Sequence, residues 1–264
     1  MGGFAHILVA TDLTDRSERA LERAAQLGRE GRAERLTLLH VVAAGLPSIL
    51  ATQQKNAAEI FLATKIAQFP AVGVPTPASA IVRTGEPFST IVGEAISGRA
   101  DLVIVGVPSK SPYVQAIVGT TAERVIRFSE RPVLLVNQPT RGPYARVLVA
   151  FDGSDGAVRG LAAALILAPE AEFRIVHAWW PPRVLLGQSD DARRIIDEDN
   201  KRLRAMVQAA AKQGASASQA APPRLSVDMV EDNPYLVVSN ELRWPDLLVF
   251  SSWALTARVV WRVS

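Results

Sequence analysis

The sequence of 264 residues contains no cysteine. The chain therefore has no disulfide framework, no thiolate zinc site and no cysteine nucleophile. It also lacks an apolar run near the roughly 18 residues that a membrane span needs. Its first residues, MGGFAHILVATD, have neither a basic segment nor a long apolar core, so no signal peptide is expected. Together these absences predict a soluble protein, which we expect in the cytoplasm.

An excess of charge of one sign is missing as well. The formal net charge is only +3 although the isoelectric point is near 9.5. Residues 1–140 hold 14 Lys and Arg against 12 Asp and Glu, and residues 141–264 hold 15 against 14. The charges alternate along presumed helices such as residues 15–35, which is typical of a solvated face with ion pairs. Nucleic-acid binders more often have a patch of one sign with aromatic residues, so no nucleic-acid partner is expected.

What the sequence does contain is a regular alternation of apolar runs and helical patterns. Apolar residues make up 48% of the chain, which is enough for a buried core. Short runs predict strands at 6–10, 35–42, 78–83, 102–105 and 133–136, and the spacing of apolar residues predicts helices between them, such as 52–69. Strands that alternate with helices indicate a parallel sheet with helices on both faces.

The pattern then begins again, which predicts two homologous domains, residues 1–140 and 141–264. Strands are predicted at 145–150, 172–178, 225–230 and 246–251, a long helix at 190–212, and a flexible connection at 213–223. Four residues of the first half have equivalents in the second: Asp12 with Asp152, His40 with His177, Pro87 with Pro234, and Asp101 with Asp246. The number of residues that separates the members of each pair is too large for the repeat of a solenoid protein. Both histidines are expected to pack at strand ends.

The most informative segment is residues 101–136. A strand ends at Gly106, a loop follows to Gly119, and a helix begins with Thr120 and Thr121. The N–H groups at the start of a helix and its positive dipole end favour an anion, so this loop predicts an anion site.

The second half lacks this loop. Residues 101–106 (DLVIVG) align with 246–251 (DLLVFS) at an offset of 145, but 122–129 align best with 257–264 at an offset of 135. About ten residues are therefore missing, and residues 257–264 take the place of the helix. The second half is predicted to lack both the anion loop and its fifth strand.

The loop carries a recognisable motif, which is glycine, two residues, glycine, nine residues, then glycine and Ser or Thr. Gly106, Gly119 and Thr120 fit this spacing, and Ser109 stands where the second glycine belongs. With the strand-one aspartates, the LLHVV strand and the Gly-Glu-Pro turn, the chain resembles a universal stress protein of the tandem two-domain type. A serine with positive φ would cost roughly 1–2 kcal/mol, whereas its hydroxyl could donate to a phosphate.

The resemblance implies an α/β fold of two adenine-nucleotide-α-hydrolase-like (Rossmann-like) domains. Their parallel sheets would have the strand order 3-2-1-4-5, and the second copy would lack strand 5. A ligand would lie beyond the carboxyl ends of strands one and four, where the strand order reverses.

The resemblance also implies a site for ATP, with Mg²⁺, in the first domain. Asp12 would accept a hydrogen bond from a hydroxyl group or orient the metal, Val41 would pack on the adenine, and the loop would hold the phosphates. The residues carried over are Asp12, Val41, Gly106, Ser109, Lys110, Gly119, Thr120 and Thr121. Only the first domain is expected to bind.

Three functions remain open from the sequence. The leading one is a stress-response protein that binds ATP or a related adenine nucleotide, as a sensor or at most a slow ATPase. The alternative is a dimeric scaffold of the same family that binds no nucleotide. An enzyme of the wider superfamily would need a substrate-specific motif, which we do not find. We expect a homodimer built on the strand at 133–136, or another cover for that edge.

Overall fold

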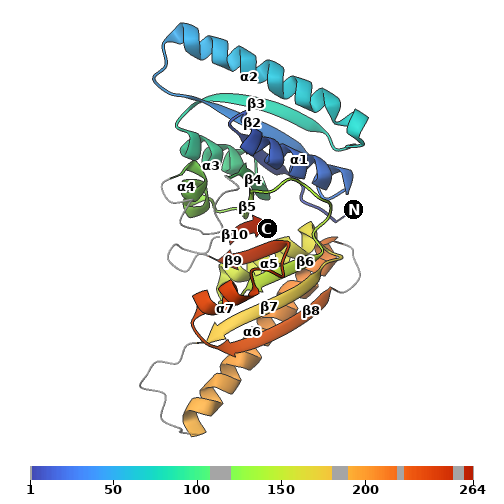
Figure 1. The fold of residues 1–264 in the computed structure, drawn as a ribbon, viewed down its shortest axis with the longest axis vertical. Helices are drawn as coiled ribbons and strands as arrows, with labels where there is room; N and C mark the ends of the chain where they lie inside the picture. Colours follow the sequence, from blue (N-terminus) through green and yellow to red (C-terminus); the bar gives the residue numbers. More distant parts are fainter. Residues whose placement is uncertain (1, 108–119, 180–189, 219–222, 252–258, 264) are drawn as a thin grey trace. The chain divides into compact units, whose positions relative to one another are not determined.

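A computed structural model of the chain describes residues 2–107, 120–179, 190–218, 223–251 and 259–263 (Figure 1). It divides into two α/β units. The first comprises Met1–Gly142 with Val260–Val263, and the second comprises Pro143–Val259.

The first unit alternates strands and helices from Ile7 to Val136. Its elements are β1 (Ile7–Thr11), α1 (Asp15–Arg29), β2 (Leu36–Ala43), α2 (Ser48–Gln68), the short 3-10 helix η1 (Pro70–Val72), β3 (Ala78–Gly85), α3 (Pro87–Ser97), β4 (Leu102–Gly106), α4 (Thr121–Phe128) and β5 (Val133–Val136). All these strands pair in parallel, in the spatial order β3-β2-β1-β4-β5. This confirms the predicted order.

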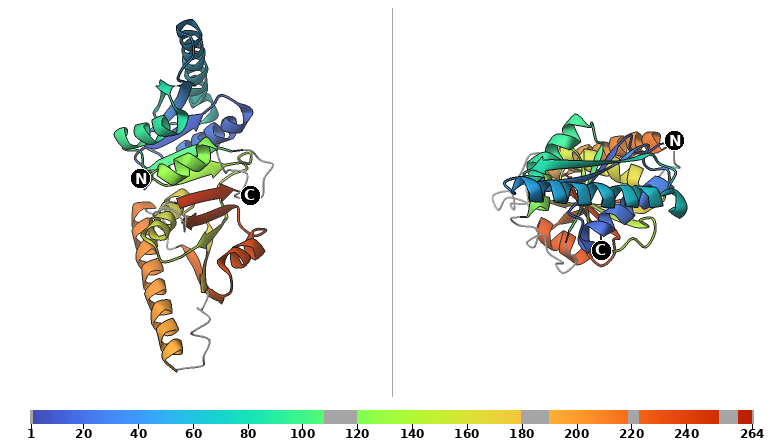
Figure 2. Two further views of the ribbon diagram at one scale, coloured as in Figure 1. Left: turned by 90° about the vertical axis from the view of Figure 1, so that its left-hand side faces the viewer. Right: turned by 90° about the horizontal axis from the view of Figure 1, so that it is seen from above.

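The second unit repeats the arrangement with four strands. It contains β6 (Arg146–Ala150), α5 (Asp155–Leu167), β7 (Glu172–Trp179), α6 (Asp190–Ser218), β8 (Arg224–Glu231), α7 (Pro234–Glu241) and β9 (Leu247–Ser251). The order of its parallel sheet is β8-β7-β6-β9. The prediction of two such domains, the second without its fifth strand, is confirmed. Figure 2 shows α6 and α7 on opposite sides of this sheet.

The core of the first unit lies around β1. All five residues of β1 are buried, and Ile7, Leu8 and Val9 are at most 1% exposed. Strands that are covered on both faces read as continuous apolar runs, which is why the sequence reveals them. α1 covers one face of β1 with the stripe Ala20, Leu21, Ala24 and Leu27, spaced as a helix requires.

The outer edge of β5 is covered within the same chain, which is the second of the two predicted alternatives. Residues Val259–Val263 form a strand, β10, and not the helix that the alignment of 257–264 with 122–129 predicted. β10 pairs in parallel with β5, with Val260 opposite Val133. A run of β-branched and aromatic residues favours a strand, and an apolar edge strand offers backbone groups for it to pair with. The edge proposed for a homodimer is therefore covered by a strand of the same chain.

Two helices are longer than predicted. α2 begins at Ser48, directly after Pro47, and not at Thr52. α6 continues to Ser218 through much of the expected connection at 213–223. The reason lies at Gly214, where a Cβ would come within 2.7 Å of Leu165 on α5. Close packing of α5 and α6 extends the helix beyond what its own sequence favours.

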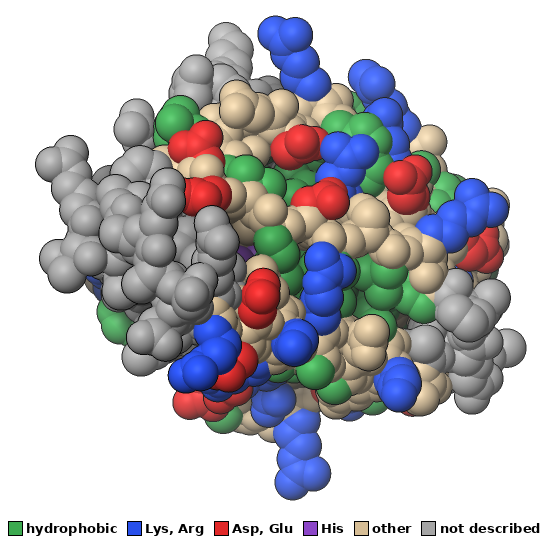
Figure 3. All heavy atoms as spheres, turned by 90° about the horizontal axis from the view of Figure 1, so that it is seen from below, with side chains coloured by type: hydrophobic (Ala, Val, Ile, Leu, Met, Phe, Trp, Pro, Cys, Tyr) green, Lys and Arg blue, Asp and Glu red, His purple; other side chains and the backbone are tan. Residues whose placement is uncertain are grey.

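Charges of both signs are mixed on the surface. Figure 3 shows a face where Lys and Arg side chains alternate with Asp and Glu, with no field of one sign. Within the part that the structure describes, no helix is long and apolar enough to cross a membrane.

Candidate functional site

The turn after β1 is built around Asp12. Its Oδ1 accepts hydrogen bonds from the backbone N–H of Thr14 at 3.0 Å and from the Thr14 hydroxyl at 2.6 Å. Partial burial raises the pKa of Asp12, but hydrogen bonds from Thr14 and Ser17 outweigh this and hold the pKa below its ordinary value. Asp12 is therefore ionised at neutral pH and lies on the surface at the carboxyl end of β1.

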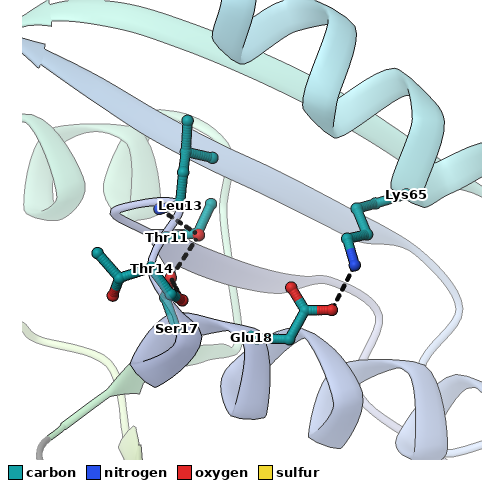
Figure 4. A network of polar contacts seen from close by, with 6 residues as sticks. All are labelled: Thr11, Leu13, Thr14, Ser17, Glu18 and Lys65. Atoms are coloured by element: carbon teal, nitrogen blue, oxygen red, sulfur yellow. Dashed lines mark hydrogen bonds and ion pairs between the residues drawn. The ribbon is translucent and has the colours of Figure 1, made fainter.

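A second set of hydrogen bonds fixes this turn to the start of α1 (Figure 4). The Thr11 hydroxyl donates to Ser17 Oγ at 2.8 Å, and Ser17 Oγ donates to the Thr14 carbonyl at 2.9 Å. The backbone N–H of Leu13 donates to Thr11 Oγ1 at 3.0 Å. Because both hydroxyls are buried, the position of the turn depends on this network.

Gly106 ends β4 against the start of α1. A Cβ at this position would lie 2.5 Å from the carbonyl oxygen of Arg16 and 2.8 Å from the Cα of Ser17, so only glycine fits. β4 is the parallel neighbour of β1, with Ala10 opposite Val105. The structure therefore brings Asp12 and Gly106 to the same edge of the sheet, at the point where the strand order reverses.

Val41 reaches the same edge from β2. Thr11 is opposite His40 in the register of β1 and β2, so Val41 lies one residue beyond the end of β1. Its side chain is half-buried. His40 Nδ1 donates to the Thr11 carbonyl at 2.9 Å, and in the second unit His177 makes the same contact with Phe151 at 2.7 Å. Both histidines therefore tie neighbouring strands together, but neither lies at the strand end that was expected, since β2 continues to Ala43 and β7 to Trp179.

The remaining predicted residues belong to the loop and to α4. Thr120 is the N-cap of α4, and its hydroxyl accepts a hydrogen bond from the N–H of Glu123 at 3.2 Å. Thr121 is the first residue of the helix. Ser109, Lys110 and Gly119 lie outside the described residues.

Leu13 is a feature that the sequence did not reveal. Its φ is 62°, in the left-handed region, and Arg99 is the other non-glycine residue with a positive φ in the described part. The equivalent residue of the second unit is Gly153, with φ 75°. The available signal was the comparison of Asp-Leu-Thr with Asp-Gly-Ser, since glycine in one copy indicates a left-handed position in both.

In the second unit, side chains bond to one another at the equivalent place, the carboxyl ends of β6 and β9. Asp152 Oδ1 accepts from the Ser154 backbone at 2.9 Å and from its hydroxyl at 2.6 Å, as Asp12 does from Thr14. In addition, Ser251 Oγ donates to Asp152 Oδ2. Ser251 ends β9 at the place that Gly106 occupies at the end of β4. The aspartate of the second unit is thus occupied within its own unit.

No group of three or more His, Asp or Glu side chains that could hold a metal is found among the described residues. A metal at this edge would need other ligands, such as the oxygens of a bound phosphate.

Known proteins resemble this chain in sequence and in fold. The model of the universal stress protein family matches residues 3–137. A curated universal stress protein of Methanocaldococcus jannaschii is 37% identical over 57 residues, which are 22% of this chain; the match spans about a third (34%) of that relative's length.

Solved structures match over different lengths of the chain. A universal stress protein from Archaeoglobus fulgidus matches with a TM-score of 0.66 at 20% identity, over 94% of this chain and 86% of that chain. That likeness shows the fold. A universal stress protein in complex with cAMP has a TM-score of 0.38 at 24% identity, over 51% of this chain and 98% of that chain.

Proposed function

Since the chain belongs to the universal stress protein family, we propose that its first unit binds an adenine nucleotide. ATP is the ligand that the family resemblance implies, and the setting is a stress response in the cytoplasm. The protein would act as a sensor of the nucleotide or, at most, as a slow ATPase.

The observation that carries this proposal is a contrast between the two units at the place where the strand order reverses. In the first unit an exposed Asp12 stands beside Gly106, which has no side chain. In the second unit Ser251 replaces the glycine and bonds to Asp152. Ligands of open parallel sheets bind beyond the carboxyl ends of the strands at the switch point. Among the described residues, the first unit has no side chain at position 106 beside its aspartate, whereas the second has the Ser251 hydroxyl bonded to Asp152.

The roles in the proposed site follow from the strand order. β2 lies on one side of β1 and β4 on the other, so the base would lie by Val41 and the phosphates by Gly106 and the start of α4. In the first helical turn, which begins at Thr121, the N–H of Glu123 is bonded to the Thr120 hydroxyl, so an anion would be held by the N–H groups of Thr121 and Ala122. Ser109, Lys110 and Gly119 would complete the phosphate contacts.

Asp12 has the chemistry for two tasks. An ionised carboxylate accepts hydrogen bonds from a ribose hydroxyl, and it is a ligand that Mg²⁺ prefers. Mg²⁺ is commonly held by one or two carboxylates together with the phosphates of its nucleotide, which fits a site with a single acidic side chain. In this arrangement the ion would arrive with the nucleotide.

Calorimetric titration with ATP tests the proposal. We expect one molecule of ATP per chain, with a dissociation constant on the order of micromolar. Asp12→Asn should weaken binding, and Gly119→Val should abolish it. Asp152→Asn is the matched control, since the same change in the second unit should leave the affinity unchanged. Absence of heat with the wild-type protein, at concentrations well above micromolar, would refute the proposal.

The alternative function, a dimeric scaffold without nucleotide, needs a surface other than the outer edge of β5. That edge is already paired with β10 of the same chain. Light scattering of the wild-type protein measures whether a dimer forms at all.

A further inference from the structure

One residue of the turn that carries Asp12 has an energetically unfavourable backbone conformation. Leu13 has φ 62°, which places its Cβ close to the following carbonyl oxygen, and leucine adopts this region rarely. Backbone outliers of this kind gather at ligand-binding sites, where the side chain has a task.

The second unit shows that the turn itself does not need a leucine. The turn after Asp152 has the same pair of hydrogen bonds to its aspartate as the turn after Asp12, with nearly the same lengths. Its left-handed residue is Gly153 at φ 75°. Glycine reaches this conformation without the steric cost. The side chain of Leu13 therefore needs an explanation other than the geometry of the turn.

The surroundings of Leu13 indicate what its side chain contacts. Figure 4 shows it pointing away from Thr14 and Ser17. It is half-buried and follows Asp12 directly. Val41, also half-buried, lies in β2 one residue beyond His40, the partner of Thr11. The base side of the proposed site thus has two incompletely buried aliphatic side chains.

We propose that Leu13 is a ligand-contacting residue that packs against the base of the bound nucleotide. This inference rests on the proposed function. The planar base buries the leucine side chain, and this contact offsets the cost of the left-handed backbone. Leu13 contributes nothing to phosphate recognition, since the phosphates lie on the β4 side of β1.

The test compares adenosine with ATP on Leu13→Gly and on Leu13→Asn. Both residues tolerate a left-handed conformation but lack the aliphatic surface. We expect each variant to weaken adenosine and ATP by the same factor, about three- to tenfold, with an unchanged or raised melting temperature. Leu13→Met should keep the wild-type affinity because it restores apolar contact.

Gly153→Ala in the second unit is the control and should leave both affinities unchanged. If the wild-type protein binds neither ligand, the proposed function and this inference fall together. If the wild-type protein binds and Leu13→Gly and Leu13→Asn bind equally well, only the inference is refuted. A lowered melting temperature with unchanged affinity would likewise assign Leu13 to packing.

Discussion

Ser251 donates a hydrogen bond to Asp152 where β9 and β6 end side by side. The same two places in the first unit hold Gly106 and Asp12. One serine hydroxyl therefore separates an aspartate that is satisfied within the fold from one that lies exposed at the edge of its sheet. This difference underlies the proposal that a single unit of the chain binds nucleotide.

Ser251→Ala should destabilise the second unit. The substitution removes a partly buried hydrogen bond to a carboxylate, for which about 1.5–3 kcal/mol is typical. Chemical denaturation measures the change. Ser239→Ala is the control, because the solvent-exposed hydrogen bond of the half-buried Ser239 runs to Leu236 within α7, so its loss should cost less than about 0.5 kcal/mol. Equal costs for the two substitutions would contradict the role given to Ser251.

Gly106→Ala should destabilise the first unit by about 1–3 kcal/mol, the range typical of overpacking. Its Cβ would meet backbone atoms of Arg16 and Ser17, which cannot move without shifting the start of α1. Gly93→Ala offers the opposite case, since Gly93 lies in α3 with nothing near its Cβ. That change should stabilise the protein by about 0.5–1 kcal/mol. Thermal unfolding of the two variants should therefore shift in opposite directions.

The buried His6 should make the protein less stable in mild acid. The ring is buried, its Nδ1 donates to the Gly98 carbonyl at 2.9 Å, and the Thr37 hydroxyl donates to Nε2 at 2.8 Å. Burial lowers the pKa of His6 and Arg35 adds to this, while the Gly98 carbonyl and Asp101 oppose it with less effect.

Because the pKa of His6 is lower in the folded protein, the free energy of unfolding should decrease as the pH falls. Below the unfolded pKa of about 6.5, the unfolded chain binds a proton that the folded protein does not bind. The contribution of His6 is therefore complete above pH 6.5 and decreases as the pH falls towards the folded pKa. The free energy of unfolding, measured from pH 8 to 5, should fall in this window for the wild-type protein and fall less for His6→Gln. A variant with the same pH profile as the wild-type protein would exclude His6 as the cause.

Arg124 joins α4 to the start of α3. Its guanidinium donates to Glu86 at 2.7 Å and lies 3.5 Å from the centre of the Phe88 ring. Both members of the ion pair are nearly half exposed, so the coupling of Arg124 with Glu86 should stay below about 1 kcal/mol and decrease in high salt. The coupling with Phe88 should be about 0.5–1 kcal/mol and depend less on salt. Double-mutant cycles at two salt concentrations measure both, and a salt-independent ion pair would contradict the prediction.

The sequence predicted those features that depend on local pattern. The apolar run of β1 and the spacing of apolar residues in α1 can be read from the sequence. Burial on both faces gives a continuous apolar run, and burial of one stripe of a helix gives a helical period. Asp12 and Gly106 could be placed at one edge because parallel strands end together once their order is assumed. The strands and helices needed only the pattern of the chain, whereas the strand order came from the family resemblance.

Features that depend on distant contacts could not be predicted. The left-handed φ of Leu13 contradicts the preference of leucine, so only the second copy, with Gly153, hinted at it. The bond of Ser251 to Asp152 joins residues 99 positions apart. The segment of β10 was predicted as a helix from its alignment with 122–129, and its strand depends on pairing with the edge of β5.

The pairing of β10 with β5 also imposes an order on biosynthesis. Val260 lies opposite Val133, so after Val133 the ribosome adds 127 residues to reach and include Val260. At roughly 5–20 residues per second, the sheet of the first unit waits roughly 6 to 25 s with its outer strand uncovered. During that interval the apolar segment Val133–Val136 can pair with another nascent chain, so the yield of correctly folded protein should depend on how quickly the ribosome completes the second unit.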